Sequence, residues 1–128
     1  MDMKLLFYAP VGDAVGERLR KMIEALVPEG EREMCRTLDA LSRMLLQPKY
    51  DLGIVVLLAS TREELWKLLS IRDLLDDVRI VLVLPDREDD TITKGHILRP
   101  RFVTYTDGNF VDIAAVINKM RGSTHCEI

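Results

Sequence analysis

The chain has 128 residues, of which 48% are hydrophobic and 30% are charged, and its formal net charge is −3. This length suits one domain that buries roughly two-thirds of its unfolded surface without a metal or a disulfide. Charges of both signs are mixed along the chain, so it lacks the basic stripe of a nucleic-acid-binding protein, and no apolar run approaches the ~20 residues of a membrane span. The two cysteines, Cys35 and Cys126, form no CxxC pair and no metal-ligand spacing, which predicts reduced thiols in a cytoplasmic protein.

Strand and helix patterns alternate five times along the chain. Apolar residues form extended runs in the predicted strands and recur every three or four residues in the predicted helices. Proline follows several of these elements, because it can neither continue a helix nor donate a strand hydrogen bond. In chain order we predict a strand at 4–9, a helix at 11–27, a strand at 31–36, a helix at 37–47, a strand within 50–60, a helix running to about residue 75, a strand at 79–84, a short helix within 87–98, a strand at 102–106, and a helix that Asn109 caps and Gly122 ends.

The order of the strands follows from their polarity. Strict alternation with short connections specifies a parallel sheet with helices on both faces. The first, third and fourth strands are the most apolar and suit central places, whereas the second and fifth carry polar residues that suit edges. The pattern therefore predicts an α/β fold, a single three-layer αβα domain of flavodoxin-like type over residues 1–122, with five parallel strands in the order 2-1-3-4-5. Residues 123–128 are expected to form a flexible tail.

The helix after the third strand has two unusual features. Ser60 and Thr61 each precede a glutamate by three residues, which is a doubled capping-box pattern. Capping explains Ser60 without a nucleophilic role, since no GxSxG turn surrounds it. The helix is also apolar nearly all round, because one stripe cannot hold all of Leu65, Leu68, Leu69, Trp66, Ile71 and Leu74. Trp66 is therefore a candidate anchor for a partner; the alternative is that it folds back onto its own domain.

The loops after the strands show no known ligand motif. Sheets of this order bind ligands beyond the carboxyl ends of strands one and three. The loop at 9–16 contains neither GxGxxG nor GK[ST], which disfavours dinucleotide, nucleotide and flavin binding. His96 and His125 lie far apart in sequence, and the acidic residues within 86–90 fit a solvated loop better than a cation site. We expect no metal and no cofactor.

The third strand opens with the tripeptide Tyr50-Asp51-Leu52. This tripeptide, together with the order of helices and strands from Lys4 to Arg121, resembles the receiver domains of response regulators. The resemblance implies where that family's working residues would fall. The phospho-accepting aspartate falls on Val56, and the metal-binding acid pair falls on Ala9 and Pro10.

The remaining family positions are also substituted. The hydroxyl residue that closes strand four falls on Leu84 or Pro85, and the lysine falls on Gly108 or Thr106, depending on the register. One register places Tyr105 where the family keeps its switch aromatic; the alternative is that Tyr105 is an ordinary edge-strand residue.

These substitutions predict a pseudo-receiver without enzymatic activity. Phosphoryl transfer needs positioned acids, a metal and a cation, and the resemblance places none of them here. We expect a phosphorylation-independent signalling or scaffolding domain that binds a protein partner or a second copy, and neither nucleic acid nor membrane. Besides Trp66, the candidate interface is the face that receivers use for partners, with His96, Arg99, Arg101, Tyr105 and Lys119.

A second hypothesis is a small-molecule or nucleotide-binding flavodoxin-like protein, possibly an enzyme. In that case the helix N-termini after strands one and three would hold an anion, with Gly12 and Ser60 donating backbone N–H groups.

Overall fold

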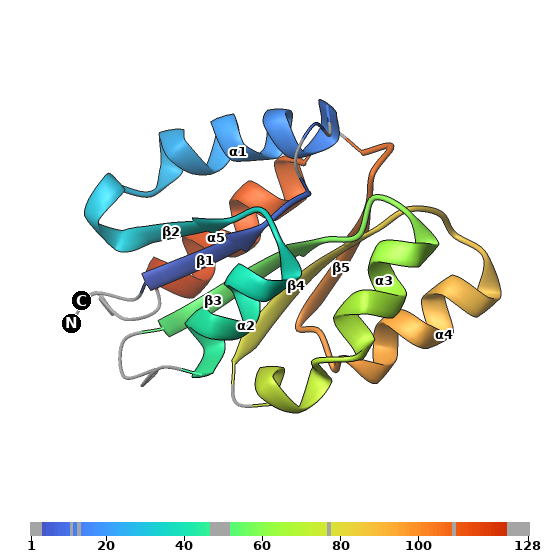
Figure 1. The fold of residues 1–128 in the computed structure, drawn as a ribbon. Coiled ribbons are helices and arrows are strands. Elements are labelled where there is room, and N and C mark those ends of the chain that lie inside the picture. The colour runs from blue at the N-terminus through green and yellow to red at the C-terminus, as the bar shows by residue number, and fades with distance from the viewer. Residues whose placement is uncertain are drawn as a thin grey trace.

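Five strands alternate with helices along the chain (Figure 1). The computed structural model describes residues 4–10, 12, 14–46, 52–76, 78–108 and 110–122. Tyr50, Asp51, Asn109 and the expected tail at 123–128 lie outside this set. The elements are β1 (Lys4–Tyr8), α1 (Ala14–Leu26), the 3-10 helix η1 (Glu29–Glu31), β2 (Arg32–Cys35), α2 (Leu38–Leu46), β3 (Leu52–Leu58), α3 (Arg62–Leu69), the 3-10 helix η2 (Arg72–Leu75), β4 (Arg79–Leu84), α4 (Asp89–Ile97), β5 (Phe102–Tyr105) and α5 (Val111–Gly122).

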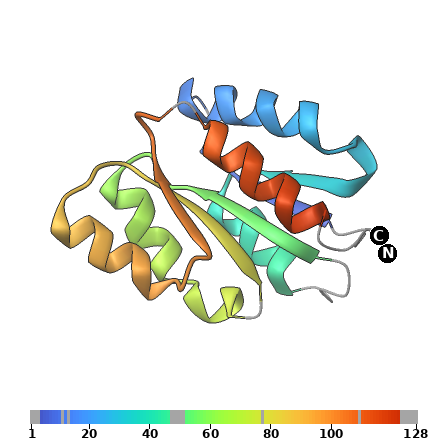
Figure 2. The ribbon, with the colours of Figure 1, turned by 180° about the vertical axis from the view of Figure 1, so that it is seen from behind.

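The strands form one parallel sheet in the order β2-β1-β3-β4-β5, which confirms the predicted flavodoxin-like topology. Helices α1 and α5 cover one face of the sheet, and α2, α3 and α4 cover the other (Figures 1 and 2). The polar edge strands are confirmed as well, since every residue of β5 is only partly buried. No helix within the described residues is long and apolar enough to cross a membrane.

Strand β3 joins two apolar cores, one on each face of the sheet. Side chains alternate between the faces of a strand, so Val55 and Leu57 pack with α2 and α3, whereas Ile54, Val56 and Leu58 pack with α1 and α5. All five side chains are fully buried. Burial on both faces explains why this strand reads as an unbroken apolar run rather than as an alternating one.

The predicted C-terminal end of the third helix, at about residue 75, was wrong, because the helix is shorter. Helix α3 ends at Leu69, Ser70 turns the chain, and η2 follows. The turn points Ile71 and Leu74 at the core that also receives Leu68, so the two apolar stripes belong to two short helices. Trp66 alone among these apolar residues stays exposed.

Only one of the two predicted caps begins α3. The Thr61 hydroxyl accepts a hydrogen bond from the backbone N–H of Glu64 at 3.1 Å, so Thr61 is the N-cap and Ser60 lies just before it. Strand β4 has its predicted bounds, and apart from α3 the other helices and strands differ from theirs by at most a few residues. Strand β2, for example, begins at Arg32 because the preceding residues form η1.

Candidate functional site

Backbone hydrogen bonds continue beyond the C-terminal ends of the strands, which we call the carboxyl edge of the sheet. Beyond the strand ends, the N–H of Ala9 donates to the carbonyl of Cys35 at 3.1 Å, and the N–H of Thr106 donates to that of Leu84 at 3.0 Å. The Thr106 hydroxyl donates to the carbonyl of Pro85 at 3.3 Å. Leu84 or Pro85, at the hydroxyl position of the receiver resemblance, therefore contacts Thr106, one of its two lysine positions. These contacts are hydrogen bonds to backbone carbonyls.

Val56 lies farther from the carboxyl edge of the sheet than the other residues that the receiver resemblance assigns to phosphoryl chemistry. It pairs with Phe7 on one side and Val81 on the other, two residues before the level of Ala9. Its side chain is fully buried. At the level of Ala9 and Pro10 the third strand supplies Leu58 and Ala59, which are also buried and apolar. A shift of the register along β3 thus brings no carboxylate to the edge.

Tyr8 and Glu64 form a link that sequence analysis missed. The Tyr8 hydroxyl donates to Glu64 Oε1 at 2.8 Å, which ties β1 to the first turn of α3. Burial, and then the hydrogen bond to Glu64, raise the pKa of Tyr8 well above its usual value. Tyr8 is therefore protonated near neutral pH and cannot act as a base. The pattern marked Glu64 only as a capping residue, because its partner lies 56 residues away.

Two further carboxylates near this edge are held by arginines. Arg62 Nε donates to Asp86 Oδ2 at 3.0 Å, and Arg87 pairs with Asp107. The hydrogen bond from Arg87 holds the pKa of Asp107 below its usual value. Among the described residues, no three acidic, histidine or cysteine side chains are grouped so that they could hold a metal ion.

Arg87 also covers Tyr105, the candidate switch aromatic. Its guanidinium carbon lies 4.3 Å from the centre of the Tyr105 ring, within cation–π range. Tyr105 is partly buried at the end of β5. His96, Arg99, Arg101 and Lys119 are exposed, but Arg101 precedes β5 whereas Tyr105 ends it. The structure therefore places Tyr105 and Arg101 at opposite ends of β5 rather than in one cluster.

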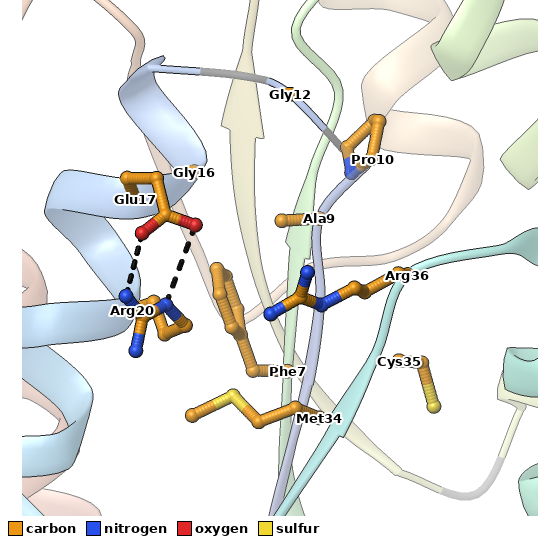
Figure 3. A pocket seen from close by; sticks show the side chains of 10 residues that line it. All are labelled: Phe7, Ala9, Pro10, Gly12, Gly16, Glu17, Arg20, Met34, Cys35 and Arg36. Atoms are coloured by element: carbon orange, nitrogen blue, oxygen red, sulfur yellow. Dashed lines mark hydrogen bonds and ion pairs between the residues drawn. The ribbon is translucent and has the colours of Figure 1, made fainter.

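A shallow hollow lies between β1, β2 and the first turns of α1 (Figure 3). Its volume is about 320 Å³, including space open to solvent. Arg20 is held by Glu17 and by Glu24, whereas Arg36 extends from the end of β2 toward β1 (Figure 3). Gly12 lines the hollow with a φ of +82°, a conformation that suits glycine. The hollow offers one exposed guanidinium but little enclosure for a ligand.

Cys35 at this hollow is expected to be unreactive. Burial, followed by the charge of Glu33, raises the pKa of its thiol to about 11. At pH 8 the thiolate fraction should be about a hundredfold smaller than in an unfolded chain, in addition to steric protection. We expect iodoacetamide to modify Cys35 in a Cys126→Ser variant only after urea unfolding. Fast modification of the folded variant, followed by intact mass, would contradict this environment.

A groove between α3 and α4 carries Trp66, the most exposed aromatic side chain among the residues that the structure describes. Trp66 is 57% exposed and Ile97 is 48% exposed, and both line an open groove of about 860 Å³ with Leu69, Ser70, Arg72 and Lys94. Lys94 Nζ lies 4.0 Å from the centre of the Trp66 ring and 2.8 Å from Asp90 Oδ2. Lys94 thus steadies the indole ring against α4 while leaving most of it open to solvent.

No family model matches this chain, and no curated protein matches it in sequence. The topology alone defines a flavodoxin-like α/β domain. Sheets of this order carry many unrelated functions, so function has to be argued from the surfaces described above.

Proposed function

We propose that this protein is a non-catalytic pseudo-receiver that acts by binding another protein, independently of phosphorylation. The observation that carries the proposal is the exposure of Trp66 beside Ile97 in the α3–α4 groove. Tryptophan offers a large contact area with few rotatable bonds, which is why it often anchors protein interfaces. Adjacent exposed apolar side chains on a small domain favour an interaction surface.

The carboxyl edge of the sheet supports the non-catalytic part of the proposal. The positions that receivers use for chemistry hold apolar or uncharged residues here: Ala9, Pro10, Val56, Leu84, Pro85, Thr106 and Gly108. The nearby carboxylates of Glu64, Asp86 and Asp107 each have a partner of their own. Among the described residues, a phosphoryl group would find no cluster of side chains at this edge that could hold a metal ion.

Treatment with acetyl phosphate and Mg²⁺ should leave the intact mass of the protein unchanged. The reason is that phosphoryl transfer requires an acceptor carboxylate, a bound metal and a neutralising cation in one place. Intact-mass spectrometry before and after incubation measures this directly. A stoichiometric, base-labile phosphoryl adduct would contradict the proposal.

Trp66→Ala should weaken partner capture while changing stability little. An exposed tryptophan that loses one cation–π contact should lower the free energy of unfolding by about 1 kcal/mol or less. The matched control is Leu68→Ala on the same helix, where a fully buried side chain is removed and the loss should be about 2–5 kcal/mol. Urea unfolding followed by circular dichroism separates the two variants.

The same variant tests binding. A pull-down from native extract should recover a partner with the wild-type protein and much less of it with Trp66→Ala. Equal recovery by both baits would remove the groove from the interface and leave Tyr105, at the end of β5, as the remaining candidate contact.

The second candidate function is the binding of a small anionic molecule or nucleotide. The hollow that contains Gly12 and Arg36 favours it, although Ser60, the other expected donor, does not line that hollow. Native mass spectrometry of the purified protein tests this candidate, because a ligand retained at stoichiometric amount would favour it over protein binding.

A further inference from the structure

We draw no further inference here: the strongest candidate, the open groove between α3 and α4 with Trp66 and Ile97, carries none beyond the proposed function, because nothing in the structure shows what covers it.

Discussion

Val56→Asp is expected to lower the free energy of unfolding by roughly 2–5 kcal/mol, because it places a carboxylate without a partner inside the sheet. Val56 is fully buried between Phe7 and Val81, in the core shared with α1 and α5. Urea unfolding of the variant and the parent measures the difference. The matched control is Val111→Asp, the same substitution at a position that is 63% exposed in the first turn of α5, where the change should be within about 0.5 kcal/mol.

The same variant should not acquire phosphorylation. Ala9 and Pro10 cannot hold a metal ion, and the new carboxylate would lie two residues below the edge of the sheet. A Val56→Asp protein as stable as its parent would show that this position faces solvent. A variant that gained a phosphoryl adduct from acetyl phosphate would show that the edge can still assemble a catalytic site.

Phe110→Ala should destabilise the domain by about 3–5 kcal/mol, since it removes a buried aromatic ring. Phe110 is 4% exposed, packs in the core with Ile113, and lies under the Arg18 guanidinium, whose central carbon is 5.0 Å from the ring centre. Its φ of +66° is a left-handed conformation that a bulky residue rarely adopts. Tertiary packing holds this residue in place against its backbone preference.

Phe110→Gly should therefore be the milder of the two truncations, by roughly 1 kcal/mol, because glycine adopts a positive φ without steric strain whereas alanine retains it. Elsewhere in a folded domain the order is normally the reverse. Chemical unfolding of both variants under the same conditions gives the comparison. A glycine variant that is less stable than the alanine variant would show that residue 110 does not adopt this conformation in solution.

The architecture could be predicted because its signals are local. The apolar run of β3, the prolines after strands, and the polar residues of β2 and β5 each depend on a few neighbouring positions. Together they were sufficient for the parallel sheet and its strand order. The break after Leu69 was not predicted, because residues 62–75 continue an apolar helical pattern and only the shape of the core underneath turns the chain at Ser70.

The candidate site was less predictable than the fold. Trp66 could be singled out from sequence, but the groove beside it depends on Ile97 and Arg72, which come from separate elements. Sequence spacing likewise could not pair Tyr8 with Glu64 or Asp86 with Arg62, since these partners lie 56 and 24 residues apart. It also could not show that Arg87 covers Tyr105.

The sequence by itself determined the class of fold and the order of the strands. Those properties depend on residue identity and on periodicity along the chain. Only the tertiary structure decided which side chains remain exposed and which charges are already paired. Such properties come from contacts between segments that are distant in sequence, and only the packing of the whole chain brings these segments together.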